Sequence, residues 1–272
     1  MKKILVLGST GMLGHSVAKH FIDKGYDVTS TYRKESQEVA AVDKKIAYNP
    51  LIHSFASLDG GYDYVINCIG TIKPFMAKDP IAARKINSVF PWELADWCND
   101  IKAKLLHITT DCVFSGKTGK YKESSVHDAL DDYGKSKSLG EPIDRCMVIR
   151  TSIIGEEIHK NASLIEWAKG QKGKSIKGFT NHYWNGITTN YYGVVCEKII
   201  ENNWHSNGLF HVHAKDDVSK FDMMTIFNKK FNLDMNIEAF TATETVDRTM
   251  RSEKDLCSKL EVPTVEEMVS SI

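Results

Sequence analysis

The sequence has few of the features that mark metal-binding, membrane or secreted proteins. Its six cysteines are scattered, with no C-x-x-C pair and no His/Cys cluster at zinc spacing, which favours reduced core thiols and no metal site. No stretch approaches the roughly 18 consecutive apolar residues of a membrane helix. The N-terminal apolar run stops at Gly8 after four residues, too short for the core of a signal peptide. We therefore expect a cytoplasmic protein that does not bind a membrane.

An excess of charge of one sign is also lacking. Lys plus Arg and Asp plus Glu each number 35, and no like-charged tract stands out, so we expect no nucleic-acid partner. Proline is sparse, with 6 residues, and the 18 glycines are too few for a disordered or fibrous chain. A length of 272 residues suits one large domain or two small ones.

The first 152 residues alternate short apolar runs with segments of helical periodicity, which is typical of parallel βαβ units. This pattern predicts an α/β fold with a doubly wound parallel sheet. The expected strands are 3–8, 27–32, 45–49, 63–70, 104–109 and 146–152, and the expected helices are 12–24, 80–99 and 132–141.

The pattern loosens beyond residue 152. The expected elements there are helices 162–170, 188–203, 219–231 and 264–272, a strand at 209–213, and an aromatic, Asn-rich loop at 179–187. We predict a dinucleotide-binding domain over 1–152, to which 188–214 returns, and a smaller C-terminal substrate lobe made of 153–187 and 215–272. Within the expected strand, His211 and His213 alternate with apolar residues, which favours a solvent-facing edge over a metal pair.

A glycine-rich turn, GSTGMLG at 8–14, joins the first expected strand to the first helix. Glycine permits a tight turn and a close approach of the backbone to a pyrophosphate, and the helix N-terminus supplies N–H donors. A purely structural turn is the alternative, but the position between strand and helix favours a dinucleotide. The residues predicted to contact it are Gly8, Thr10, Gly11, Met12, Leu13 and Gly14.

The end of the second expected strand indicates which dinucleotide binds. Enzymes that use NAD place an acidic residue there, whereas a cation accommodates the 2′-phosphate of NADP. Here the strand ends in Tyr32, Arg33 and Lys34, which favours NADPH, with NADH as the second choice. The structural alternative is a solvated basic turn.

The strongest constellation combines Tyr133 and Lys137 with Thr110. Residues four apart share a helix face, so Tyr133 and Lys137 can point together into the crevice at the carboxyl ends of the strands. A nearby lysine and an oxidised nicotinamide would lower the pKa of the phenol, and Thr110 could bind the substrate oxygen. A chance Y-x-x-x-K pair is the alternative, which the upstream glycine turn makes less favourable.

With these motifs the sequence resembles the extended short-chain dehydrogenase/reductase family, and within it the dTDP-4-dehydrorhamnose reductases of nucleotide-sugar metabolism. The resemblance covers roughly the first 190 residues. It rests on GSTGMLG (8–14), VINCIG (65–70), INSVFPWELADWC (86–98), TTDCVFSG (109–116), YGKSKSLGE (133–141), IRTS (149–152) and NHYWNGITT (181–189). It implies a Rossmann fold, an oxidoreductase of deoxysugar biosynthesis and a nucleotide-sugar substrate, and it is compatible with assembly of the protein into a homodimer.

The resemblance also implies roles for individual residues. Thr110, Tyr133 and Lys137 match the catalytic triad, with Tyr133 as proton donor, and Asn87 matches an asparagine that supports the lysine through water. The further residues implied to line the cofactor are Cys68, Ile69 and Gly70, with Asn49 near the adenine. Those implied to contact the sugar nucleotide are Asp111, Val113, Phe114, Asn161 and Arg248.

Two departures from the family pattern leave the identity of the sugar open. Cys112 replaces an aromatic residue in the S-T-D-Y-V-F motif, and the loop at 181–189 lacks the family's acid and proline. Trp184 in that loop is a candidate for stacking on a sugar or base, with ordinary packing as the alternative.

The sequence therefore predicts NADPH-dependent reduction of a 4-keto group in a nucleotide-linked deoxysugar. Two alternatives stay open: an epimerase or dehydratase that retains its cofactor, and a non-catalytic regulatory subunit of the same fold. The basic strand end counts against the first, and the intact triad counts against the second.

Overall fold

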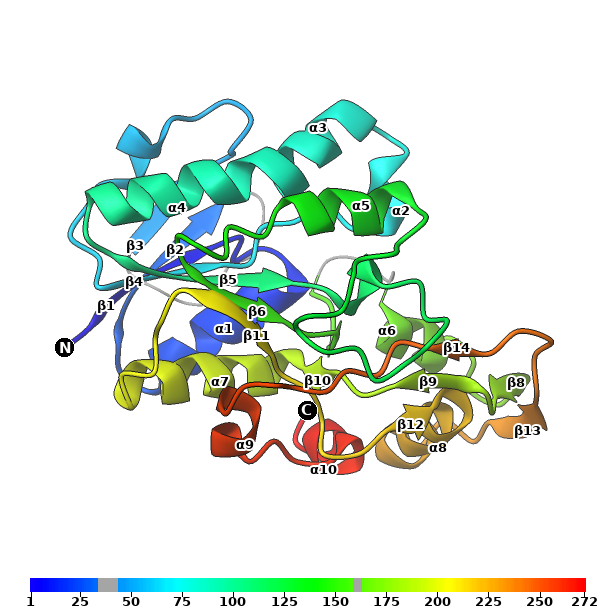
Figure 1. Cartoon of the computed structure of the whole chain (residues 1–272). Helices are drawn as coiled ribbons and strands as arrows, with labels where there is room; N and C mark the ends of the chain where they lie inside the picture. The colour runs from blue at the N-terminus through cyan, green and yellow to red at the C-terminus, as the bar shows by residue number, and fades with distance from the viewer. Residues whose placement is uncertain (34–43, 159–162) are drawn as a thin grey trace.

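A seven-stranded parallel sheet forms the centre of the protein. The computed structural model describes residues 1–33, 44–158 and 163–272. The strand order is β11-β6-β5-β4-β1-β2-β3, and every neighbouring pair is parallel (Figure 1). The strands are β1 (Lys3–Leu7), β2 (Asp27–Tyr32), β3 (Lys44–Ala47), β4 (Tyr64–Asn67), β5 (Lys104–Thr109), β6 (Met147–Arg150) and β11 (Gly208–His211). The predicted doubly wound fold is confirmed.

Helices cover both faces of this sheet, so its strands are apolar on both sides. In β1, Ile4 and Val6 join the core beneath one layer of helices, whereas Leu5 and Leu7 join a second core on the other face. The first layer contains α1 (Met12–Asp23) and α7 (Thr189–Glu201), and the second contains α3 (Pro80–Arg84), α4 (Phe90–Asp100) and α5 (Asp132–Leu139). A π-helical turn at Lys85–Val89 links α3 to α4, so the predicted helix at 80–99 is continuous but irregular.

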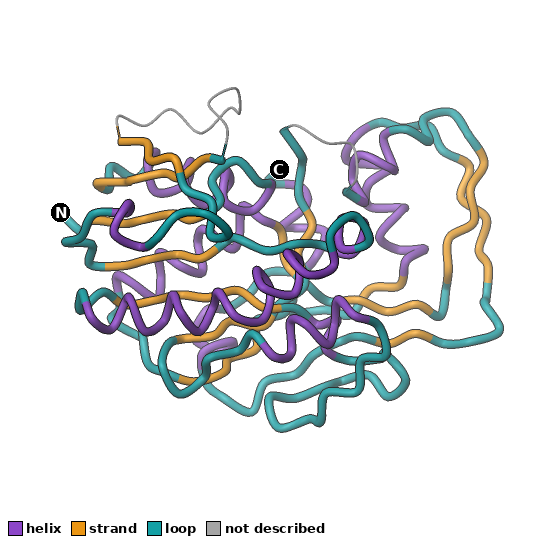
Figure 2. Tube along the Cα trace, turned by 90° about the horizontal axis from the view of Figure 1, so that it is seen from above, coloured by secondary structure: helices purple, strands orange, loops and turns teal. Residues whose placement is uncertain are grey.

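The remaining elements pack outside the sheet, and we call the described residues of 153–187 and 215–272 the C-terminal lobe. The three-stranded sheet β12-β9-β14 lies within it, and β8 pairs with β13 as a separate two-stranded ribbon, which projects from the molecule in Figure 2. The elements of the C-terminal lobe are β7 (Ile153–Ile154), α6 (Leu164–Lys169), β8 (Ser175–Phe179), β9 (His182–Trp184), β10 (Ile187–Thr188), β12 (Val218–Ser219), α8 (Lys220–Phe231), β13 (Asn236–Phe240), β14 (Val246–Asp247), α9 (Leu256–Leu260) and α10 (Val265–Ser270). Three short helical turns complete the described elements: η1 (Phe55–Leu58), α2 (Lys73–Met76) and η3 (Asp111–Val113). The division into two domains stays a prediction.

Two predictions about this part of the chain were wrong. The segment 179–187 is not a loop, because β9 lies within it, β10 begins at its last residue, and both pair with strands that are distant in the sequence. His211 does not face solvent, although β11 is an edge strand. Its side chain is 0% exposed and accepts a hydrogen bond from Arg150 (2.8 Å), while its backbone N–H donates to the carboxylate of Glu123 (2.9 Å).

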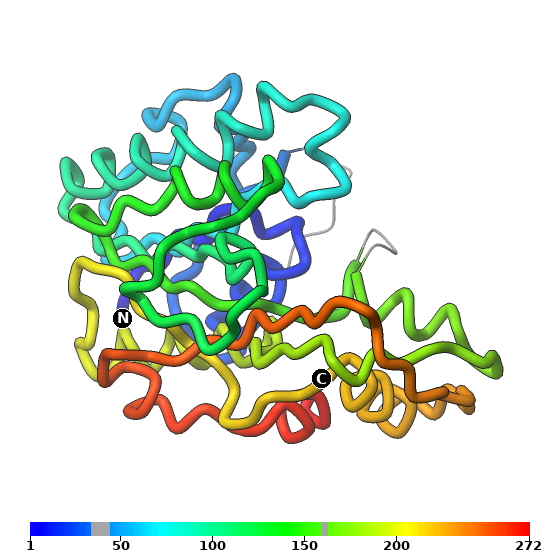
Figure 3. Tube along the Cα trace, turned by 45° about the vertical axis from the view of Figure 1, so that its right-hand side comes forward, coloured from blue at the N-terminus to red at the C-terminus, as the bar shows by residue number. Residues whose placement is uncertain are grey.

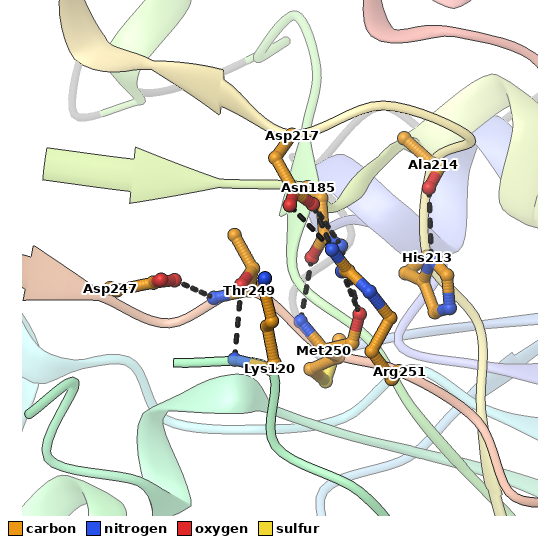
Figure 4. A network of polar contacts seen from close by, with 9 residues as sticks. All are labelled: Lys120, Asn185, His213, Ala214, Asp217, Asp247, Thr249, Met250 and Arg251. Carbon is orange, nitrogen blue, oxygen red and sulfur yellow. Dashed lines mark hydrogen bonds and ion pairs between the residues drawn. The ribbon is translucent and has the colours of Figure 1, made fainter. Parts of the chain in front are cut away.

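The C-terminal segment closes over the loop that follows β5. Figure 3 shows the residues around 250 running beside the loop at 115–128, and the backbone N–H of Tyr121 donates to the carbonyl of Thr249 (2.9 Å). Buried Asn185 holds the same segment through two bonds to the backbone of Met250 (3.0 and 2.9 Å) (Figure 4). An ion pair between Arg251 and Asp217 (2.6 Å) completes this network, which thus ties four segments together.

Among the described residues, no helix has the length and hydropathy needed to cross a membrane. In the same part of the chain, no group of three or more His, Cys, Asp or Glu side chains is arranged to hold a metal ion.

Candidate active site

The glycine-rich turn lies at the carboxyl edge of the sheet, between β1 and α1. Gly8 has a φ of +84°, in the left-handed region that favours glycine, and a Cβ on Gly14 would lie 2.2 Å from the carbonyl oxygen of Gly8. Gly11 is the N-cap residue of α1 and has no side chain to occupy the N–H groups of the first turn. This geometry fits a pyrophosphate at the N-terminus of a 12-residue helix.

The loop after β4 packs against this turn, and the implied contact of Cys68, Ile69 and Gly70 with the cofactor stays a prediction. A Cβ on Gly8 would lie 3.1 Å from Cγ1 of Ile69 and 3.2 Å from the carbonyl carbon of Cys68. Thr10 and Met12 are partly exposed in the turn, whereas the side chain of Leu13 is 6% exposed and belongs to the core. Of Leu13, therefore, the backbone and not the side chain is placed to contact a cofactor.

The end of β2 lies at the same edge of the sheet. Arg33 follows Tyr32 and is exposed. The backbone N–H of Tyr48 donates to the carbonyl of Tyr32 (2.8 Å), which brings the neighbouring Asn49 to this strand end. Lys34 lies outside the described residues.

The three triad residues come from β5 and α5. Thr110 follows β5, where its hydroxyl donates to Asp111 (3.1 Å) and accepts from the backbone N–H of Cys112 (3.2 Å). Tyr133 lies in the first turn of α5, and Lys137, 5% exposed, lies one turn later. The Lys137 ammonium donates to the carbonyl oxygen of Ile108 (3.2 Å), so both α5 residues face the end of β5.

Burial controls the ionisation of this pair. It raises the pKa of the Tyr133 phenol above its usual value, although a hydrogen bond with Thr110 lowers it in part. Burial lowers the pKa of Lys137 to about 8, and the carboxylate of Glu141 opposes that shift. From the sequence we expect a lysine and an oxidised nicotinamide to lower the pKa of Tyr133. In the protein without cofactor, that pKa is raised instead. A phenol that keeps its proton at neutral pH suits a proton donor in a reduction.

Asn87 lies within the π-helical turn and anchors α5. Its side-chain amide donates to the carbonyl of Thr71 (2.9 Å) and to the hydroxyl of Ser136 (3.1 Å), and its oxygen accepts from the N–H of Thr71 (2.9 Å). Asn87 thus joins the loop after β4 to the residue beside Lys137. Its implied support of Lys137 through water stays a prediction.

The residues implied to contact the sugar nucleotide divide into two groups. Asp111 accepts a hydrogen bond from Thr110 of the triad (3.1 Å), and Arg248 donates to the carbonyl oxygens of Phe114 and Ser115 in the loop that follows (3.1 and 3.2 Å). Val113 and Phe114 are 0% exposed, and the Phe114 ring stacks on Tyr121 with 4.2 Å between centroids. Their side chains therefore pack internally instead of facing a ligand. Asn161 lies outside the described residues.

The burial of Trp184 favours the packing alternative, and its stacking on a sugar or base stays a prediction. Its side chain is 6% exposed and belongs to the main hydrophobic core. It follows the residue that pairs with β14 and is itself paired with Val218 of β12. A Cβ on Gly186 would lie 2.3 Å from the indole ring, so the ring is tightly enclosed. The packing alternative accounts for Trp184.

Sequence reasoning missed three polar residues around the site. Lys220 is the first residue of α8, and burial lowers the pKa of its ammonium. The nearby Asp111 raises this pKa in part, whereas Arg248 lowers it further. A cation in the first turn of a helix interacts unfavourably with the helix dipole, and this unusual position could have singled out Lys220 in the sequence. Asn67 and His107 are each 0% exposed and interrupt otherwise apolar strands.

The chain matches the family described as "RmlD substrate binding domain" over residues 1–269. Among curated proteins it is 24% identical to methionine adenosyltransferase 2 subunit beta of Rattus norvegicus, over 96% of this chain and 82% of that protein. It is 28% identical to dTDP-4-dehydrorhamnose reductase of Aggregatibacter actinomycetemcomitans, over 84% of this chain and 79% of that protein.

Solved structures share the fold. The dTDP-4-dehydrorhamnose reductase from Bacillus anthracis in complex with NADP has a TM-score of 0.77 at 17% identity, covering 99% of this chain and 98% of that one. The UDP-N-acetylglucosamine 4-epimerase from Methanobrevibacter ruminantium has a TM-score of 0.81 at 14% identity, covering 99% and 96%. At these identities the likeness concerns the fold alone.

Proposed function

The chain belongs to the family of the RmlD substrate binding domain, and from this premise we propose that it reduces a 4-keto group of a nucleotide-linked deoxysugar with NADPH. The observation that carries the proposal is the alignment of Thr110, Tyr133 and Lys137 where β5 ends and α5 begins. The loop after β4 connects that position to the glycine turn, which supports a nicotinamide cofactor beside the triad.

The roles of the triad follow from their chemistry. NADPH, when bound, supplies the hydride that reduces the carbonyl carbon. The Tyr133 phenol donates its proton to the carbonyl oxygen, and the Thr110 hydroxyl turns from Asp111 to donate a hydrogen bond to the same atom. With a pKa of about 8, Lys137 is mainly protonated at neutral pH and stabilises the phenolate that remains. Tyr133 then regains a proton from water, which completes the balance.

Three groups of this chain fit the cofactor. The glycine turn and the N-terminus of α1 suit the pyrophosphate, and the exposed guanidinium of Arg33 suits the 2′-phosphate that distinguishes NADPH. Asn49 lies near the same strand end, where an adenosine would reach.

The test is NADPH oxidation by the purified protein with 4-keto-6-deoxy sugars carrying dTDP, UDP, GDP or CDP. We expect one of them to oxidise NADPH with many turnovers. A protein that carries stoichiometric bound NAD and is inert toward added NADPH would instead be an epimerase or dehydratase.

A non-catalytic subunit is the second candidate, because several curated relatives are named methionine adenosyltransferase 2 subunit beta. The intact triad favours the enzyme. The two are separated by mixing the protein with a methionine adenosyltransferase. Altered transferase kinetics together with no NADPH oxidation across the panel would establish the subunit role.

A further inference from the structure

A relay of hydrogen bonds links the loop after β4 to the C-terminal end of α5. The backbone N–H of Ile69 donates to the side-chain oxygen of Asn67 (3.0 Å), and the Asn67 amide meets Nδ1 of His107 (3.0 Å). On the other side of the ring, Nε2 of His107 meets the carbonyl oxygen of Gly140 at the end of α5 (3.0 Å). The relay therefore joins the loop beside the glycine turn to the helix that carries Tyr133 and Lys137.

The backbone groups at the two ends fix the direction of every bond. Because the Asn67 oxygen accepts from a backbone N–H, its amide nitrogen must donate, and Nδ1 of His107 must accept. The proton of the neutral ring is then on Nε2, where it is donated to the Gly140 carbonyl. Burial, and the Lys137 cation beside it, hold the pKa of His107 well below its usual range, in agreement with this neutral form.

His107 makes one of two hydrogen bonds that align α5 with β5. Nε2 of His107 donates to the carbonyl of Gly140 (3.0 Å), and the ammonium of Lys137 donates to the carbonyl of Ile108, the residue after His107 in β5 (3.2 Å). Tyr133, Lys137 and Gly140 are four and three residues apart, so they form one stripe on the helix. The neighbouring residues His107 and Ile108 of β5 thus contact this stripe at Gly140 and Lys137.

Gly140, at the C-terminal end of this stripe, is closely packed against neighbouring residues. A Cβ on Gly140 would lie 1.8 Å from the carbonyl oxygen of Asn87, which leaves the end of α5 enclosed between Asn87 and His107. The helix has only 8 residues and is too short to be stable by itself. Its position therefore depends on such anchors.

We propose that His107 is a positioning residue that fixes the axial register of α5 on β5, so that Tyr133 and Lys137 stay opposite Thr110 and Ile108. Its effect on rate rests on the proposed reductase function, whereas its effect on the helix does not. A displacement of about 1 Å at reacting groups can cost about 100-fold in rate.

Three variants separate the two ends of the ring. His107→Gln keeps a donor at the position of Nε2, His107→Asn keeps polar atoms only near Nδ1, and His107→Leu removes both. A matched control is His205→Leu, because His205 also hydrogen bonds to β5, at the carbonyl of Leu105 (3.1 Å), away from the triad.

Hydrogen exchange by mass spectrometry measures the helix directly, without substrate. In His107→Leu and His107→Asn we expect the amides of 134–141 to exchange at least about tenfold faster, and in His107→Gln and His205→Leu to stay near wild type. With the active sugar nucleotide, we expect kcat to fall about 10–100-fold in the first two variants while KM changes less than about threefold.

The Gln and Asn variants decide the outcome even if the Leu variant fails to fold. Equal exchange and equal kcat in these two variants would overturn the proposal, as would a uniform loss of protection over the whole sheet. If no sugar nucleotide is reduced, the reductase proposal fails, and the exchange data still decide the role of His107.

Discussion

The sheet and the C-terminal lobe use polar residues in different ways. At the carboxyl edge of the sheet, Lys137 is buried with its ammonium on a single carbonyl, and its pKa is lowered to about 8. In the lobe, buried Asn185 has partners for both ends of its amide, and the Arg251 guanidinium is paired with Asp217. Lys137 at the sheet edge thus has a lowered pKa that chemistry can use, whereas Asn185 and Arg251 in the lobe hold segments of the chain together.

This contrast predicts that substitutions at the sheet edge change rates and binding, while substitutions in the lobe change stability. The largest effect is expected for Tyr133→Phe, which removes the proton donor without removing the ring. Turnover should fall by about 10²–10⁴, the usual size of a general-acid contribution, while the Kd for NADPH and the thermal unfolding stay close to wild type. Steady-state NADPH oxidation and fluorescence titration measure both. Undiminished turnover would remove Tyr133 from the mechanism.

Trp184→Ala is expected to have the next largest effect, on stability. The side chain is enclosed in the core, so its removal should lower the free energy of unfolding by about 3–5 kcal/mol. Urea unfolding measures the loss, with Trp167→Ala as the control because that tryptophan is 46% exposed. A normal stability with a raised KM for the sugar nucleotide would show that Trp184 faces the substrate after all.

Asn185→Ala tests the network of Figure 4. The substitution leaves the backbone N–H of Met250 without its partner, whereas the Met250 carbonyl keeps its bond from Arg251 (2.7 Å), and the loss should cost about 1–3 kcal/mol of unfolding free energy. NADPH affinity should not change. Asn202→Ala, which removes an exposed amide bonded to one carbonyl, should cost less than about 0.5 kcal/mol in the same urea titration. Equal losses would mean that the network adds nothing to cohesion.

The smallest expected effect concerns the choice of cofactor. Replacing Arg33 and Lys34 by Ala should weaken NADPH binding by about 10–100-fold, because charge-assisted hydrogen bonds to a phosphate are lost, while NADH binding barely changes. Isothermal titration with each cofactor measures the ratio. Lys45→Ala, on an exposed position of β3, is the control. Equal losses for both cofactors would show that these residues only support the fold.

The same two regions explain how much the sequence could predict. The strands of the sheet and the glycine turn are contiguous patterns, and parallel strands deliver their carboxyl ends to one edge, so β1, β2, β5 and α5 could be predicted with nearly correct bounds. The lobe depends on pairing between distant segments: β9 has partners at 218–219 and 246–247, and two-residue strands leave almost no local pattern.

The site divides in the same way. The spacing of Tyr133 and Lys137 predicts a shared helix face, and the structure gives it. Burial is a property of the assembled core, so the sequence could not show that Trp184 and Phe114 are enclosed, nor that burial raises the pKa of Tyr133. The relay through His107 joins Asn67, His107 and Gly140, which are far apart in the sequence, so it could be recognised only in the folded structure.

The most direct test of the central claim is transfer of the isotope label from NADPH deuterated at C4 of the nicotinamide. The protein is incubated with the labelled cofactor and the 4-keto-6-deoxy sugar nucleotide that it consumes, and the product is examined by mass spectrometry and NMR. The account predicts one deuterium at C4 of the sugar, one oxidised cofactor per product, and loss of both in Tyr133→Phe. A product without deuterium, or conversion without net oxidation of the cofactor, would contradict it.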